Sequence, residues 1–143
     1  MIVCDTGPFV ALSNEKDQYY FVANELFRDF FLTEEEIVLP ATVLAEVCYW
    51  LNEHGGPEVE AAFLAAVADG AFTLVELTTS DVERMIELVR QFSSFPLGAT
   101  DASVIAIAER LGIQEIATFD RRHFSAITPK NGGHFTLLPE VLP

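Results

Sequence analysis

The 143-residue sequence lacks a long hydrophobic run, although half of its residues are hydrophobic. Its apolar residues form short blocks, and none reaches the roughly 18–20 residues that are needed to span a bilayer. The N-terminal stretch MIVCDTGPF has no basic residue before its apolar part and meets an acid at Asp5, so we expect no signal peptide. The sequence therefore predicts a cytoplasmic protein that does not enter a membrane.

Cysteine is scarce, with only two residues in the chain. Cys4 and Cys48 lie inside apolar segments and lack the spacing that is typical of zinc ligands. We expect both to be reduced thiols in the core. The pattern argues against a disulfide framework and against a zinc site built on cysteine.

Basic residues are also few, because 8 lysines and arginines stand against 22 acids and give a formal net charge of −14. Such a surface repels nucleic acid as a whole and favours a basic partner. After residue 119 the chain has three bases, Arg121, Arg122 and Lys130, and only two acids, Asp120 and Glu140. We therefore expect any phosphate-binding patch near the C-terminal end.

The sequence does contain an alternation of short apolar strands and longer helical segments. Short apolar runs closed by turn residues predict strands at 1–5, 36–40, 71–77, 114–120 and 134–139. Apolar periodicity, with prolines at helix starts and glycines at helix ends, predicts helices at 8–14, 17–31, 41–56, 57–70, 79–92 and 97–112. The order predicts one α/β domain over residues 1–143, with a mainly parallel central sheet flanked by helices.

Two predicted helices have a well-defined apolar face. In the helix at 79–92 this face consists of Val82, Met85, Ile86 and Val89. In the helix at 41–56 it consists of Val43, Leu44, Val47, Cys48 and Leu51, and Glu46 lies at its edge. On spacing alone Glu46 is a surface residue, although this position also allows it to reach inward.

Two acids directly follow predicted strands. Asp5 ends the first strand and Asp120 ends the fourth, so in a parallel sheet both would project from the same edge, where function gathers. Asp101 opens the helix before the fourth strand. Each acid also has an ordinary explanation, because Asp favours turns and is stabilised by ~0.3–1 kcal/mol near a helix N-terminus.

A cluster of three or four such acids would be costly. Two unit charges ~4 Å apart repel by about 4 kcal/mol at an effective dielectric constant near 20. Protons or a cation must offset this repulsion, and carboxylate oxygens are hard ligands that suit Mg²⁺ or Mn²⁺. Such a metal, together with phosphate oxygens of a substrate, is what metal-assisted phosphodiester hydrolysis requires.

Four stretches of the chain, in order, resemble the motifs of the PIN domain and, more narrowly, of the VapC ribonuclease toxins of toxin–antitoxin pairs. These stretches are MIVCDTGPFVALSN, LPATVLAEVCYWL, LGATDASVIAIAERLG and IATFDRRHF, and the resemblance covers nearly the whole chain. It implies that four catalytic acids surround a bound Mg²⁺ or Mn²⁺, namely Asp5, Glu46, Asp101 and Asp120. It also implies that three hydroxyl side chains support these acids, namely Thr6, Thr118 and Ser103.

The resemblance further implies a metal-dependent endoribonuclease that acts on RNA, forms a homodimer and is neutralised by a protein antitoxin. The net charge of −14 fits a basic antitoxin, and it leads us to expect weak affinity for RNA. Arg121, Arg122 and Lys130 are the candidate contacts to RNA phosphates, although the first two fit a solvated basic turn equally well. The aromatic helix at 17–31, with Tyr20 and Phe27, is the candidate dimer surface.

The alternative is a catalytically silent PIN-like module that binds a protein partner. The presence of all four acids favours the enzyme over this alternative. His123 and His134 are candidate general acids or bases, but a loop position is the simpler interpretation of both. The aromatic run at 19–21 could stack on RNA bases, but burial against the core or a partner is the simpler interpretation.

Overall fold

A five-stranded parallel sheet forms the centre of the protein in the computed structural model, which describes residues 1–143. The strands are β1 (Ile2–Cys4), β2 (Ile37–Pro40), β3 (Thr73–Val75), β4 (Glu115–Ala117) and β5 (Thr136–Leu138). They lie in the order β3-β2-β1-β4-β5, and every neighbouring pair is parallel. The predicted α/β fold with a parallel sheet is confirmed.

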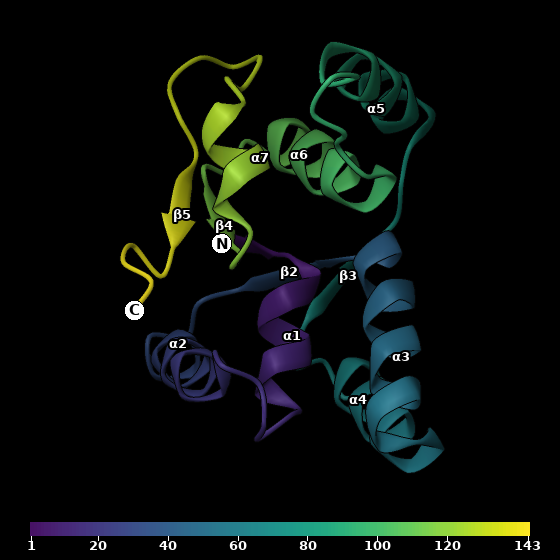
Figure 1. Ribbon diagram of the computed structural model, residues 1–143, viewed down its shortest axis with the longest axis vertical. Coiled ribbons are helices and arrows are strands. Elements are labelled where there is room, and N and C mark those ends of the chain that lie inside the picture. The colour runs from purple at the N-terminus through teal and green to yellow at the C-terminus, as the bar shows by residue number, and fades with distance from the viewer.

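Seven helices flank the sheet. They are α1 (Thr6–Leu12), α2 (Tyr20–Leu32), α3 (Ala41–Gly55), α4 (Pro57–Ala68), α5 (Thr79–Gln91), α6 (Ala99–Leu111) and α7 (Arg121–Ala126). Figure 1 shows α5, α6 and α7 on one side of the sheet and α1, α2 and α4 on the other. Helix α3 packs against α1, α4 and α6 and so contacts both layers. None of the helices has the length and apolar character that crossing a membrane requires.

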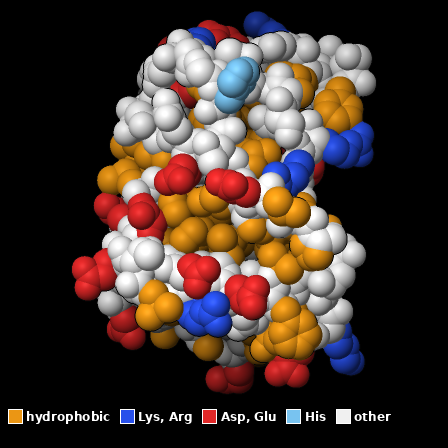
Figure 2. Space-filling view, turned by 90° about the vertical axis from the view of Figure 1, so that its left-hand side faces the viewer, with side chains coloured by type: hydrophobic (Ala, Val, Ile, Leu, Met, Phe, Trp, Pro, Cys, Tyr) orange, Lys and Arg blue, Asp and Glu red, His pale blue; other side chains and the backbone are white.

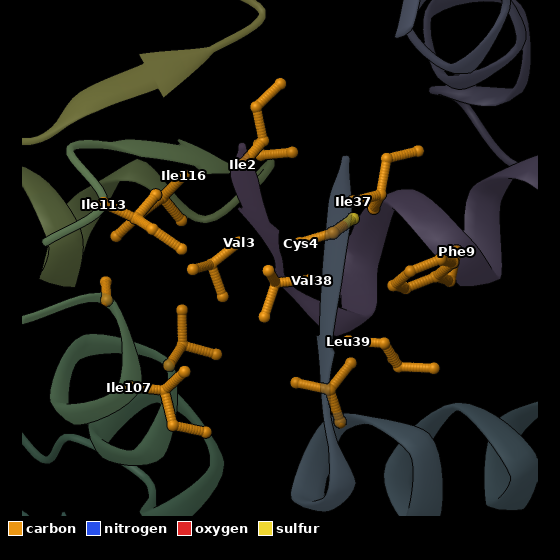
Figure 3. Close-up of a cluster of buried hydrophobic side chains, with 14 of the residues drawn as sticks. Ile2, Val3, Cys4, Phe9, Ile37, Val38, Leu39, Ile107, Ile113 and Ile116 are labelled. Carbon is orange, nitrogen blue, oxygen red and sulfur yellow. The ribbon is translucent and has the colours of Figure 1, made fainter. Parts of the chain in front are cut away.

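The core fills both sides of the sheet. Val3 and Val38, which are partners in the register of β1 and β2, point towards Ile107 of α6, whereas Leu39 points towards Phe9 of α1 (Figure 3). Every residue of β1 and β2 is buried. Because helices cover both faces, these strands are continuous apolar runs without polar alternation.

Helix α7 is the one helix that the sequence did not predict. It has six residues, too few for an apolar periodicity to be visible in the sequence. The carboxylate of Asp120 caps it by accepting a hydrogen bond from the backbone N–H of Arg122 at 3.1 Å, and the buried Phe124 anchors it in the core. A short capped helix therefore takes the place of the basic turn that the sequence suggested.

Helix α5 is confirmed, but its apolar face points mostly to solvent. Val82, Ile86 and Val89 are each more than 40% exposed. Met85 of the predicted face does pack against the core, and Leu88 is fully buried. The inward side of the helix also carries ion pairs to α6, between Asp81 and Arg110 at 3.0 Å and between Arg84 and Glu109 at 2.8 Å. The apolar pattern indicated the inward face only in part, because charged pairs occupy part of the contact between the two helices.

The aromatic helix α2 divides its rings between the core and the surface. Phe27 is only 2% exposed, and its ring centroid lies 5.3 Å from that of Phe9. Phe27 therefore cannot serve as a dimer contact, and the choice of this residue was wrong, whereas a dimer surface on α2 stays a prediction. The exposed apolar side chains of α2 are Phe21, Phe31 and Leu32.

Both cysteines are free thiols, as predicted. Cys4 is buried in β1, whereas Cys48 on α3 is half-buried. The apolar face predicted for α3 is also confirmed, because Val43, Val47 and Leu51 are buried.

Candidate active site

The carboxyl ends of β1 and β4 lie side by side, at the point where the order of the strands reverses. Open α/β sheets bind their ligands at such a point. Cys4 pairs with Ala117 in the register, so the residues that follow them meet: the Oγ1 of Thr118 donates a hydrogen bond to the Oδ2 of Asp5 at 2.8 Å. Both side chains are buried. The structure thus brings together the first predicted acid and one of its predicted hydroxyl partners.

Asp101 and Asp120 form a second group together with a histidine. One ligand atom from each of Asp101, Asp120 and His123 lies within 4.8 Å of the others. The Nδ1 of His123 is 3.4 Å from the Oδ2 of Asp120 and 3.9 Å from the Oδ2 of Asp101. The ring of His123 packs on Phe95, with 4.5 Å between the ring centroids.

His123 is therefore a residue of the site, although a loop position was the simpler interpretation of the sequence. The available signal was its spacing, because residues three apart on a helix share a face and Asp120 lies three residues before His123. That spacing has meaning only once residues 121–126 are known to form a helix. His134, the other candidate, is exposed and does not line the cavity described below.

Glu46 reaches the site from α3. One turn earlier, the hydroxyl of Thr42 forms a hydrogen bond with the hydroxyl of Ser103, which also donates to the carbonyl oxygen of Thr100 at 2.6 Å. Ser103 is fully buried. This contact fixes the start of α3 against the start of α6, so Ser103 positions Glu46 relative to Asp101.

An open cavity of about 840 Å³ connects these groups. Its walls include Asp5, Glu46, Asp101 and Asp120, so all four predicted acids share one space, and they also include Thr6, Arg121 and Arg122. Lys130 lies elsewhere, because its ammonium group pairs with Glu87 of α5 at 2.7 Å. Two of the three predicted phosphate contacts are thus at the cavity and the third is not.

Two of the acids have raised pKa values. Burial, followed by the negative charge of Asp101, raises the pKa of Asp5 to about 7, against the opposing hydrogen bonds from Thr6 and Thr118. Burial, followed by the charge of Asp120, raises the pKa of Asp101 to about 6, against the opposing effect of His123. In both cases burial and a neighbouring carboxylate disfavour the charged form of the acid.

The residues at the site fit a hard divalent cation. Their donors are mainly carboxylate oxygens, which Mg²⁺ and Mn²⁺ prefer. The Oγ1 of Thr6 is buried at the cavity and has no hydrogen-bond partner, so a polar group that enters the cavity would satisfy it. A bound cation would also relieve the repulsion that raises the pKa values of Asp5 and Asp101.

The fold and the acid-lined cavity define an α/β protein with a candidate metal centre at the switch point of its sheet. The model of the PIN domain matches residues 2–128, and the chain belongs to this family. Ribonuclease VapC26 of Mycobacterium tuberculosis is 28% identical over 138 residues, which are 96% of this chain and 100% of the relative. The predicted family is thereby confirmed.

Solved structures of toxins share the fold. VapC20 of Mycobacterium tuberculosis, described as a toxin that cleaves the sarcin–ricin loop, matches with a TM-score of 0.75 and 21% identity over 86% of this chain and 92% of that one. The DNA-bound VapBC of Salmonella typhimurium matches with a TM-score of 0.68 and 16% identity, over 90% and 92% of the two chains.

The substitution Thr118→Val should weaken metal binding without unfolding the protein. It removes the hydroxyl that holds Asp5, and the loss of a group that orients a metal ligand typically costs ~10–100-fold in affinity. Calorimetric titration with Mn²⁺ measures this effect. Thr73→Val is the matched control, because that hydroxyl bonds to the exposed Glu36 away from the site. Equal affinities in the two variants would show that Thr118 does not position Asp5.

Proposed function

We propose that the protein is a divalent-metal-dependent endoribonuclease that hydrolyses phosphodiester bonds in RNA. The observation that carries the proposal is the meeting of four acids, from four separate segments of the chain, in one cavity at the switch point of the sheet. Membership of the PIN domain family and the likeness to a named ribonuclease support it.

Asp5, Glu46, Asp101 and Asp120 would hold Mg²⁺ or Mn²⁺, and His123 lies beside the last two of these acids. When bound, such a metal activates a water and neutralises charge on the phosphate. The protein contributes the orientation of its acids: Thr118 bonds to Asp5, and the cap of α7 engages Asp120.

Arg121 is the proposed contact to an RNA phosphate. Its Nη1 donates to the carbonyl oxygen of Glu140 at 3.1 Å, which anchors the guanidinium group, while its Nε and Nη2 are buried without partners. The hydrogens of Nε and Nη2 point the same way and match two oxygens of one phosphate. Arg122, held over the ring of Phe95 at 4.6 Å, would contribute a second, more exposed charge.

We further propose that the protein is the toxin of a toxin–antitoxin pair and acts in the cytoplasm, where its RNA substrate is. One solved structure that shares the fold, from Klebsiella pneumoniae, is described as a toxin–antitoxin complex, and two others are described as DNA-bound VapBC. The net charge of −14 suits a basic antitoxin. Figure 2 shows acidic side chains around a hollow lined by hydrophobic ones, a surface suited to a partner that is both basic and apolar.

A homodimer is also part of the proposal. The exposed Phe21, Phe31 and Leu32 of α2 offer apolar area for an interface between two copies. Light scattering of the pure protein tests this state.

The nuclease activity should depend strictly on added metal. Purified protein free of any partner, incubated with total cellular RNA and Mg²⁺ or Mn²⁺, is expected to produce discrete fragments, and EDTA is expected to prevent their formation. Gel electrophoresis of the RNA measures both results. Absence of cleavage over a range of metal and salt concentrations would instead favour the silent, protein-binding module.

A further inference from the structure

Trp50 is the only tryptophan of the chain, and it lines the same cavity as the four acids. It lies one turn after Glu46 on α3, so the two side chains project from the same side of the helix. Its side chain is 41% exposed. A large aromatic ring is therefore presented to a space that also holds the candidate metal ligands.

The surroundings of Trp50 hold its ring in place. His54, a further turn along α3, packs against it with 5.3 Å between the ring centroids and an interplanar angle of 32°. The Nδ1 of His54 lies 2.9 Å from the carbonyl oxygen of Trp50, so this neighbour is itself fixed. Both residues line the cavity. Trp50 is a supported ring with open space beside it.

The charges of the cavity favour an uncharged contact to the substrate. Besides the four acids, Asp17 also lines the cavity, and Arg121 and Arg122 are its only lysine or arginine side chains. Contacts to phosphates therefore supply less of the affinity than they do in a basic nuclease. Stacking of a base on an aromatic ring contributes ~1–3 kcal/mol per base and does not depend on charge.

The size of the cavity also permits a base beside the reacting phosphate. Its volume of about 840 Å³ lies within the range of ~300–1,000 Å³ that is common for pockets that enclose a small ligand. The four acids, Trp50 and His54 all line this one cavity. A nucleotide whose phosphate lies at the acids could thus place its base, or that of its neighbour, on the indole ring.

We propose that Trp50 stacks on a nucleobase of the RNA next to the bond that is cleaved, and so selects an unpaired nucleotide. This inference rests on the proposed ribonuclease function. In a duplex the faces of each base are covered by its neighbours, so only a base that has left the stack can lie on the indole ring. Trp50 is then a determinant of specificity, distinct from the acids that hold the metal.

The single tryptophan makes the test direct. A single-stranded RNA oligonucleotide is titrated into the Asp101→Asn protein in the presence of Mg²⁺, and the substitution prevents cleavage. Binding of the oligonucleotide is expected to quench the tryptophan fluorescence. The same oligonucleotide annealed to its complement is expected to leave the fluorescence unchanged. Because no other tryptophan is present, the signal reports on this site alone.

Variants in the same Asp101→Asn background measure the contribution of the ring. By anisotropy of a labelled oligonucleotide, Trp50→Ala should raise the Kd about 5- to 150-fold, the equivalent of ~1–3 kcal/mol. Trp50→Phe, which keeps an aromatic ring, should recover part of this loss. Leu64→Ala is the matched control, because Leu64 on α4 is apolar, is 42% exposed and does not line the cavity, so its Kd should not change. Circular dichroism confirms that each variant is folded.

The two proposals fail in different ways. If the wild-type protein cleaves RNA but Trp50→Ala binds as tightly as its parent, or duplex and single strand quench equally, the stacking role is overturned and the nuclease stands. If the oligonucleotide does not bind at all, the stacking role is overturned as well. If single strands quench and bind through Trp50 but no metal supports cleavage, the base-binding site stands and the nuclease does not.

Discussion

Replacing Asp101 with asparagine is expected to reduce RNA cleavage by at least about 10³-fold while the fold stays intact. The substitution keeps the size of the side chain and removes one charge from the group formed by Asp101, Asp120 and His123. Metal ions stabilise the charge of a transition state by several kcal/mol, and each ~1.4 kcal/mol corresponds to a factor of ten in rate. Single-turnover cleavage of a labelled RNA with Mn²⁺ measures the change.

The matched control is Asp69→Asn, at the exposed end of α4 and outside the cavity, which should cleave at the wild-type rate. Circular dichroism and the midpoint of thermal unfolding check that both variants are folded. An Asp101→Asn protein that keeps a tenth or more of the activity would contradict the assignment of this acid to the metal centre.

Replacing Asp5 with asparagine should make the metal-free protein more stable at pH 8. Substitutions at buried positions usually lower the stability of a protein, so this effect would be the opposite of the common one. The pKa of Asp5 is about 7 in the folded state, against an ordinary value of 3.8. Between these values the folded state binds more protons than the unfolded state, so the stability of the metal-free protein falls as the pH rises from about 4 to 7. A shift of about three pKa units corresponds to roughly 4 kcal/mol, which asparagine would recover because it does not ionise.

Urea unfolding in EDTA at pH 5 and pH 8 measures this difference. The wild-type protein should be less stable at pH 8 than at pH 5, and the Asp5→Asn protein should show a smaller difference. Adding Mn²⁺ at pH 8 should stabilise the wild type, since the cation binds the ionised acids, and should do so much less in the variant. A variant that is less stable than the wild type at pH 8 in EDTA would show that burial of a charged Asp5 costs little.

The sequence predicted the centre of the fold because its strands are simple to recognise. β1 is a short apolar run followed by Asp5, and β4 is a short run followed by Thr118 and Asp120. Parallel strands bring such ends to the same edge of the sheet. The meeting of Asp5 with Thr118 follows from that rule together with the adjacency of β1 and β4, which the sequence does not show. Helix α7 and the position of His123 were missed, because six residues are too few for a periodic pattern.

The walls of the cavity were the hardest part to predict. Glu46 and Trp50 lie one turn apart on α3 and so share a side of the helix, but whether that side faces Asp101 depends on the contact between Thr42 and Ser103. The apolar face of α5 shows the converse, since Val82 and Ile86 have the spacing of a core face and nevertheless lie at the surface. In both cases the packing of two helices, and not the pattern of one, determines which side chains are buried.

Asp120 both caps a helix and lines the cavity. The same carboxylate caps α7 and lies beside His123, while α7 also carries the guanidinium of Arg121 into the cavity wall. A substitution at position 120 therefore alters the helix that presents two other functional groups. The free-energy effects of substitutions at Asp120, Arg121 and His123 are therefore not expected to add, so the role of each residue has to be measured in double-mutant cycles and not from single substitutions alone.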